Sequence, residues 1–433
     1  MSETLFQNVN LINPKTKFND FCDVLIKDNY IKSIQKPNEI IPSNKTKVIS
    51  YKNSILIPGI IDLRVTSRDP GEPHIESLES LLKAAAHGGI TSLACLPNTS
   101  PCLDDTSMVD SLKLRAESIG LSKLLTYGAA TKGLKDQEIA ELGLLSEAGV
   151  VGFSNGDNPI YNPLIMQRVL SYSSMFSLPI IQHADVPELS FETEATSGEI
   201  ATRLGLRGVP SITEVMLIQR DIELLKVFGG KYHVSHISTQ DAVNCIKNAK
   251  NEGINITCDT SPNYFILNDS SLINYDTRYK LSPPLRNEIN RVAIIEGIKD
   301  GTIDAISSDH VPQDRDAKIL PFSIAKPGSL GIETLLSASL SLFHSKQIPL
   351  IKTIELLTSG PASILKLDSG NLTKGTSADM TLIDLEVDWT VNGNQMQSLS
   401  SNTCLEGIKM KGKVLGCWRD GKNIFFYKEY DQK

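Results

Sequence analysis

Short apolar runs and amphipathic stretches alternate through the middle of the chain, and only the two ends depart from this alternation. Apolar runs of about 4–8 residues bounded by Gly, Pro or Asp are typical of buried strands, and a 3.6-residue apolar period is typical of covering helices. Strands are predicted at 90–96, 123–129, 150–153, 179–183, 231–236, 255–259 and 302–308. Helices are predicted between most of them, at 75–87, 104–119, 160–174, 212–228 and 239–251.

This repeated strand–helix order predicts an α/β protein built on a (β/α)₈ TIM-type barrel. A doubly wound open sheet is the alternative architecture. It is not supported by a motif, because the chain has neither the Gly-x-Gly-x-x-Gly fingerprint nor a P-loop.

Both ends of the chain are strand-rich and lack the helical period. Strand-like runs with turns occur at 5–12, 24–34 and 47–57, and again at 378–385, 407–416 and 423–427. We therefore expect a small β-sandwich domain formed by both termini. The expected division is 1–57 and 371–433 for this β domain and 58–370 for the barrel.

Composition excludes some function classes. The chain has 433 residues, 40% of them hydrophobic, and a formal net charge of −7, with no basic stretch interleaved with aromatics, so a nucleic-acid partner is not expected. No signal peptide and no membrane-spanning apolar run is visible. Seven scattered cysteines without a Cys-x-x-Cys motif suit buried thiols in a reducing cytoplasm.

Ionisable side chains gather where the predicted strands end. His183, His236 and His310 all lie at such ends, although the chain has only seven histidines, and Asp157 and Asp309 lie there too. The carboxyl ends of parallel barrel strands meet at one face, so a site is predicted there.

Several motifs, in order from about 58 to 421, resemble the dihydroorotase family of the amidohydrolase superfamily. They are PGIIDL at 58–63, LPNT at 96–99, QHA at 182–184, HVSHIST at 233–239, PPLR at 283–286, GTID at 301–304, SDHVP at 308–312, GIET at 331–334, GTSAD at 375–379 and KGKV at 411–414. The resemblance implies reversible closure of carbamoyl aspartate to dihydroorotate at a zinc site. Zinc there would acidify a bound water and polarise the amide carbonyl.

The implied metal ligands are only partly present. The family's His-x-His pair falls on Arg64 and Thr66, and its bridging Asp falls on Gly156, beside Asp157. Arginine offers no lone pair to a metal. The remaining ligand positions, all retained, are His183, His236 and Asp309, the last of which would also be the catalytic proton shuttle in an active enzyme.

The implied substrate contacts are also mixed. Arg68 and Asn98 match the pair that binds the substrate carboxylate in the family. Three other functional positions depart from the family pattern, namely Asn263, Ser282 and Gln313.

The changes at functional positions inside a preserved frame resemble noncatalytic dihydroorotase-like chains that assemble with aspartate carbamoyltransferase. On this interpretation no cofactor is expected, a residual site of His183, His236 and Asp309 stays empty, and the Arg64 guanidinium replaces the metal's charge beside Asp309 and Asp157. The alternatives are a zinc-dependent dihydroorotase with a rearranged metal site, and another small-molecule role on the same barrel. A homodimer is expected by family analogy.

Overall fold

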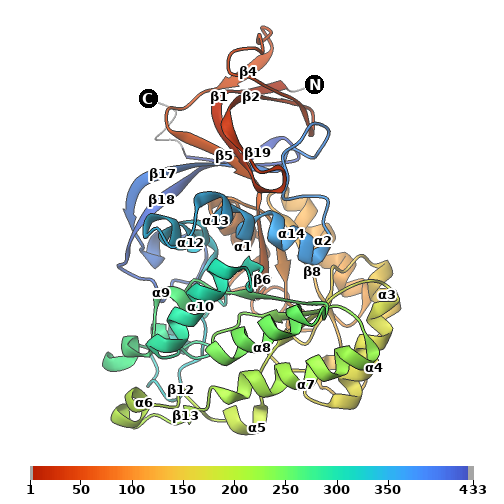
Figure 1. Ribbon diagram of the computed structural model, residues 1–433, viewed down its shortest axis with the longest axis vertical. Coiled ribbons are helices and arrows are strands. Elements are labelled where there is room, and N and C mark those ends of the chain that lie inside the picture. The colour runs from red at the N-terminus through yellow and green to blue at the C-terminus, as the bar shows by residue number, and fades with distance from the viewer. Residues whose placement is uncertain (1–2, 428–433) are drawn as a thin grey trace.

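The computed structural model describes residues 3–427. Strands from both ends of the chain pair in one eight-stranded sheet, called the terminal sheet here, at the top of Figure 1. Its order is β19-β18-β17-β5-β1-β2-β3, and β4 pairs with β1. The bounds are β1 (Glu3–Asn13), β2 (Phe18–Lys27), β3 (Tyr30–Gln35), β4 (Thr46–Ile49), β5 (Ser54–Pro58), β17 (Met380–Thr390), β18 (Lys409–Arg419) and β19 (Lys422–Phe426).

The terminal sheet has a core of its own, which joins residues far apart in sequence. Leu56 of β5 lies opposite Leu382 of β17 in the antiparallel register, and both are fully buried. The ring of Phe6 packs edge-on against Trp418, with ring centroids 4.9 Å apart. The pairing order is consistent with the β-sandwich expected from both termini.

Two runs expected to be single strands are each broken in the structure. The run 24–34 is a hairpin, because Asp28 adopts a left-handed conformation (φ 55°) that ends β2 and turns the chain into β3. An aspartate tolerates this conformation better than most residues do. The run 47–57 is divided between β4 and β5, which both pair with β1 in parallel.

Parallel strands occupy the middle of the chain and pair in chain order. One sheet contains β6 (Ile60–Val65), β7 (Ile90–Cys95) and β8 (Lys123–Thr126). A second contains β9 (Gly128–Ala129), β10 (Phe153–Ser154), β11 (Ile180–His183), β14 (Tyr232–Ser235), β15 (Ile256–Thr260) and β16 (Ala305–Ile306). Val65 bridges His310 in parallel, so the segment after β16 lies beside β6. The α/β content expected from the sequence is therefore present.

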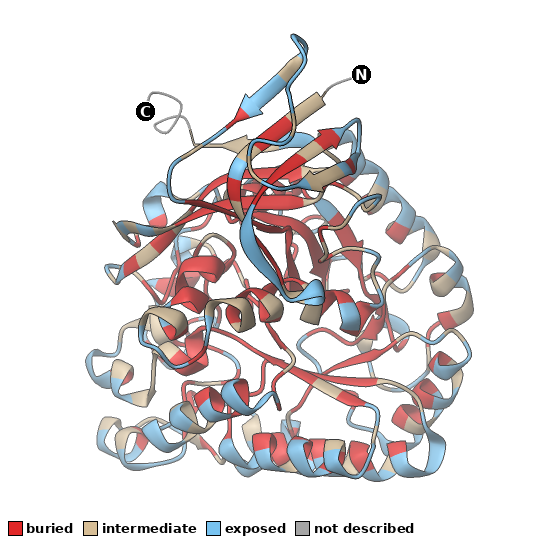
Figure 2. Cartoon of the chain, turned by 45° about the horizontal axis from the view of Figure 1, so that its top comes forward, coloured by how far each residue is buried: buried red, intermediate tan, exposed pale blue. Residues whose placement is uncertain are grey.

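Helices surround the parallel strands with their buried sides inward (Figure 2). The longer helices are α1 (Leu78–His87), α2 (Thr106–Ile119), α4 (Pro163–Ser174), α7 (Ile212–Phe228), α8 (Gln240–Asn251), α10 (Glu288–Asp300), α12 (Leu335–His344) and α13 (Leu350–Leu357). Shorter elements are α3 (Leu142–Glu147), α5 (Pro187–Ser190), α6 (Glu199–Leu204), α9 (Asn263–Ile266), α11 (Arg315–Lys318), α14 (Ser359–Leu365) and the strand pair β12 (Ala195–Thr196) and β13 (Gly208–Val209).

Capping side chains set where the helices begin. Ser77 caps α1 by accepting a hydrogen bond from the Ser80 amide at 3.1 Å, so this helix begins three residues later than the apolar pattern predicts. Asn162 caps α4 in the same way and delays its start to Pro163. Thr239 caps α8 and leaves the preceding residues in the loop that carries His236.

Two expectations from composition concern the chain as a whole. All seven cysteines are unpaired, and five of them are buried. Within residues 3–427, no helix has both the length and the apolar character needed to span a bilayer.

Candidate functional site at the carboxyl ends of the parallel strands

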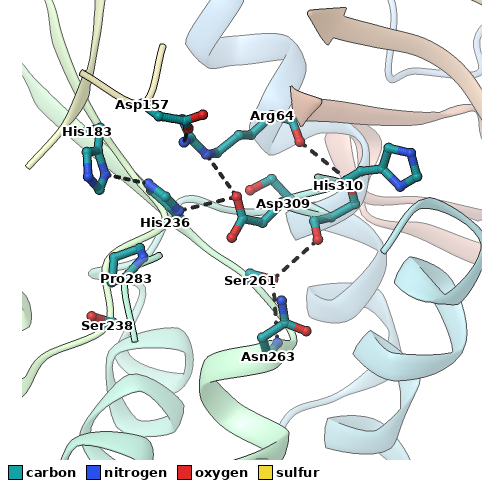
Figure 3. A network of polar contacts seen from close by, with 12 residues as sticks. Arg64, Asp157, His183, His236, Ser238, Ser261, Asn263, Pro283, Asp309 and His310 are labelled. Carbon is teal, nitrogen blue, oxygen red and sulfur yellow. Dashed lines mark hydrogen bonds and ion pairs between the residues drawn. The ribbon is translucent and has the colours of Figure 1, made fainter. Parts of the chain in front are cut away.

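Five of the residues singled out from the sequence meet at the carboxyl ends of the parallel strands (Figure 3). They form what we call the strand-end cluster: Arg64 on β6, Asp157 after β10, His183 at the end of β11, His236 after β14 and Asp309 after β16. His236 and Asp309 both adopt positive φ angles, 40° and 51°. Residues other than glycine rarely adopt positive φ angles, and those that do are concentrated at functional sites.

The guanidinium of Arg64 lies between two carboxylates. Its Nε donates to Asp309 Oδ1 at 2.9 Å, and its Nη2 donates to Asp157 Oδ1 at 2.6 Å. Arg64 is only 1% exposed, and its Nη1 has no hydrogen-bond partner among the described residues. Burial would lower the pKa of Arg64, but the carboxylates of Asp157 and Asp309 outweigh burial and raise it. Arg64 is therefore a fixed cation inside the cluster.

Asp309 is a buried anion with cationic or hydrogen-bonding neighbours. Burial would raise its pKa, but His236 and Arg64 outweigh this effect and hold the pKa of Asp309 at about 2. His236 contributes charge only when its ring is protonated, whereas Arg64 is charged at every relevant pH. Arg64 is therefore the constant counterion of Asp309.

The two histidines and Asp309 lie in a row. His236 Nε2 hydrogen-bonds His183 Nδ1 at 2.9 Å, and its other nitrogen, Nδ1, lies 3.3 Å from Asp309 Oδ1. Burial, followed by the charges of His236 and Arg64, lowers the pKa of His183 well below its ordinary value, so this ring is neutral at pH 7.

Asp259 holds the backbone of His236 in place. Its carboxylate accepts hydrogen bonds from the His236 backbone amide, from His233 Nε2 and from Ser307 Oγ, each at 2.8 Å. The other ring nitrogen of His233, Nδ1, lies 2.9 Å from Thr257 Oγ1 on the neighbouring strand. Asp259 is the last residue of the predicted strand 255–259, and no role was predicted for it. The sequence could have indicated this role, because a carboxylate at the end of a buried strand requires hydrogen-bonding partners.

Asp157 joins the cluster to Asn98. Its second oxygen, Oδ2, accepts a hydrogen bond from Asn98 Nδ2 at 2.9 Å. The preceding residue, Gly156, has a φ of 67°, and a Cβ placed there would lie 2.9 Å from Asn98 Cβ. A side chain at 156 would therefore displace Asn98, so a carboxylate is provided here by Asp157 and not by residue 156.

Arg68, the other expected substrate-binding residue, and Gln313, a position that departs from the family pattern, both donate to backbone carbonyls of nearby loops. Arg68 donates through Nε to the Pro312 carbonyl at 3.0 Å and forms an ion pair with Glu72 at 3.4 Å. Gln313 donates to the Pro327 carbonyl at 2.8 Å. These contacts hold the loops around the cluster in place.

The three remaining positions that depart from the family pattern also lie at this face. Thr66 is buried beside His310, with its Oγ1 unpartnered among the described residues. Asn263 Oδ1 contacts Cys404 Sγ at 3.1 Å. Ser282 lines two adjoining cavities, of about 220 and 230 Å³.

These two cavities open the cluster to small molecules. The first is lined by Arg68, Asp157, Asp309 and Gln313, and the second by His183 and Arg286 among others. Polar groups that converge on a small cavity are typical of a ligand site.

The zinc site implied by the sequence resemblance does not fit these donors. A catalytic zinc needs three protein ligands that converge on one point. Here His236 lies between His183 and Asp309 and contacts both, and Asp309 Oδ1 already accepts a hydrogen bond from Arg64 Nε. Among residues 3–427, no group of three or more His, Cys, Asp or Glu side chains is arranged to hold a metal ion.

Comparison with known proteins identifies the family. The protein-family model described as dihydro-orotase-like matches residues 53–242 of this chain. A dihydroorotase from Ehrlichia canis is 37% identical over 421 residues, which cover 96% of this chain and 94% of the relative. A dihydroorotase from Syntrophotalea carbinolica is 38% identical over 418 residues, which cover 96% and 98%.

A solved structure supports the fold. The L-hydantoinase (dihydropyrimidinase) from Arthrobacter aurescens superposes with a TM-score of 0.87 at 23% identity, covering 98% of this chain and 96% of the hydantoinase. At this identity the likeness concerns the fold alone. Taken with the dihydroorotases that match nearly the whole sequence, it leads to one conclusion: this chain belongs to the dihydroorotase family.

Proposed function

We propose that this chain is a catalytically silent dihydroorotase-family subunit, built on a (β/α)₈ barrel (58–370) and a β domain from 1–57 and 371–433. In the proposal it forms a homodimer that assembles with aspartate carbamoyltransferase and supports its activity. The observation that carries the silent state is the Arg64 guanidinium, which is paired with both Asp157 and Asp309. The partner follows from the resemblance to noncatalytic chains of this family.

The physical argument is charge substitution. A buried carboxylate such as Asp309 needs a compensating charge. In a metal-dependent relative that charge would come from the metal, whereas here Arg64 supplies it through a direct hydrogen bond. A metal ion placed beside Asp309 would have to displace a buried guanidinium that carries the same sign of charge.

One alternative has a specific observation in its favour. The relatives that match 96% of this chain are named dihydroorotase, and His183, His236, Asp309, Arg68 and Asn98 remain at the strand ends. The alternative is an active zinc-dependent dihydroorotase with a rearranged metal site.

One experiment separates the two proposals. The purified chain is assayed for bound zinc and for dihydroorotate hydrolysis, with and without added zinc, and is then mixed with the aspartate carbamoyltransferase of the same organism. The silent-subunit proposal predicts no turnover under any condition, and a complex that co-elutes in gel filtration and raises carbamoyltransferase activity. Stoichiometric zinc together with turnover would establish the alternative, and a chain with neither turnover nor association would refute both.

A further inference from the structure

Asp157 makes the contacts of a bound carboxylate ligand, although it belongs to the chain. Its two oxygens are held by different donors from different strand ends: Oδ1 by Arg64 Nη2 at 2.6 Å and Oδ2 by Asn98 Nδ2 at 2.9 Å. Charge-assisted contacts to both oxygens are the usual way in which proteins hold a carboxylate. The Asp157 side chain is 47% exposed, so this position is reached from solvent.

We propose that Asp157 is an intramolecular occupant of a carboxylate-binding position between Arg64 and Asn98, and that it excludes small carboxylates from the site. This proposal rests on the proposed silent function. It names the class of ligand that the position would accept, and it gives the reason why the wild-type chain does not accept that ligand. The ligand class is a small organic carboxylate that would enter the cavity of about 220 Å³ beside Asp157.

The backbone at Gly156 makes this occupation possible. Gly156 adopts a φ of 67° and packs against the Asn98 side chain, with no space for a Cβ between them. The chain therefore passes close to Asn98 and delivers the next residue's carboxylate to it. Arg64 Nη1 stays buried without a hydrogen-bond partner among the described residues, so one donor of this position is unused.

The charges explain the exclusion. Arg64 contributes one positive charge, and Asp309 and Asp157 contribute two negative charges, while Arg68 is paired with Glu72. A carboxylate from solution would add a further negative charge beside Asp157. Without the Asp157 carboxylate, the charges of Arg64 and Asp309 balance each other. Arg64 Nη2 and Asn98 Nδ2 are then free to donate to an incoming carboxylate.

The test is binding of L-dihydroorotate to the full-length chain by calorimetry, with dihydrouracil, which lacks the carboxylate, as the matched probe. Asp157→Ala is expected to bind L-dihydroorotate about tenfold or more tightly than the wild type, because one like charge beside the ligand is removed. Asp157→Asn, which keeps the side-chain shape, is expected to bind with an affinity between the two. Dihydrouracil binding is expected to be the same in all variants.

The control is Asp110→Ala, which removes an exposed aspartate of α2 and is expected to bind like the wild type. Far-UV circular dichroism and melting establish that each variant is folded. The proposal is overturned if the wild type binds L-dihydroorotate as tightly as Asp157→Ala, if neither binds it, or if dihydrouracil gains equally. Turnover is measured separately: activity in the wild type would refute the silent function without changing the comparison of affinities.

Discussion

Replacing Arg64 with methionine tests whether its guanidinium compensates the buried carboxylates. Methionine replaces the unbranched aliphatic part of the arginine side chain but removes both ion pairs, to Asp309 at 2.9 Å and to Asp157 at 2.6 Å. Removing one partner of a buried ion pair costs about 3–5 kcal/mol of stability. The half-exposed Asp157 can be hydrated, and Asp309 keeps His236 at 3.3 Å. We therefore expect a loss of about 3 kcal/mol at pH 7, the lower end of that range.

The loss is expected to depend on pH with a defined sign. In the wild type, the pKa of Asp309 is about 2, below its ordinary value of 3.8. This difference stabilises the fold by roughly 2 kcal/mol above pH 4, and the contribution is lost as the pH falls toward 2. Without Arg64, His236 alone opposes the effect of burial, so the pKa of Asp309 rises and the variant accepts a proton at a higher pH than the wild type does. The stability difference between wild type and variant should therefore shrink between pH 7 and pH 4.

The assay is urea unfolding followed by far-UV circular dichroism at pH 7 and pH 4. Lys83→Met is the control, because it breaks an exposed pair with Glu79 on α1 and is expected to cost no more than about 0.5 kcal/mol. Adding Asp309→Asn to Arg64→Met is expected to recover at least half of the loss at pH 7. The reasoning is refuted if Arg64→Met costs no more than the control, or costs the same at both pH values.

Three further outcomes are expected. Arg64→His with Thr66→His places two imidazoles beside the remaining strand-end donors, so zinc retained after dialysis, measured by mass spectrometry, should rise above the wild-type level; no rise would contradict the interpretation of these positions. Burial raises the pKa of Glu333 to about 7, so the wild type loses stability as the pH rises from 4.5 to 7. Glu333→Gln should therefore have a higher melting temperature than the wild type at pH 8 and the same melting temperature at pH 4. Equal melting temperatures at pH 8 would contradict this prediction. Phe6→Ala should cost about 3–4 kcal/mol and shift Trp418 emission to the red, since the two rings pack together; an unchanged spectrum would argue against that contact.

The fold could be predicted from the sequence to the extent that it depends on local patterns. The helix 212–228 and the strands around 90–96 and 179–183 follow directly from apolar periodicity. The breaks in the N-terminal runs 24–34 and 47–57 could not be predicted, because a single left-handed residue such as Asp28 decides whether a run continues or turns. The pairing of β5 with β17 joins segments more than 300 residues apart. The strand-like runs at both ends of the chain suggested a shared β domain but not which strands pair.

The site was predictable residue by residue but not contact by contact. Strand-end position was enough to bring His183, His236 and Asp309 to one face, and the resemblance to the family placed Arg64 with them. The contact between Asn98 and Asp157 depends on how the loop after β10 bends at Gly156, and no periodic pattern encodes that bend. The serial order of the two histidines and Asp309 depends likewise on positive φ angles that the sequence does not reveal.

The tight packing of Gly156 against Asn98 bears on how this chain can evolve. An aspartate introduced at 156 alone would collide with Asn98, and a histidine introduced at Arg64 alone would leave two carboxylates without a permanent counterion. Either of these two single changes toward the family's ligand pattern is therefore expected to be harmful before a second change can help. Selection acting one substitution at a time would therefore oppose the appearance of that pattern at positions 64 and 156.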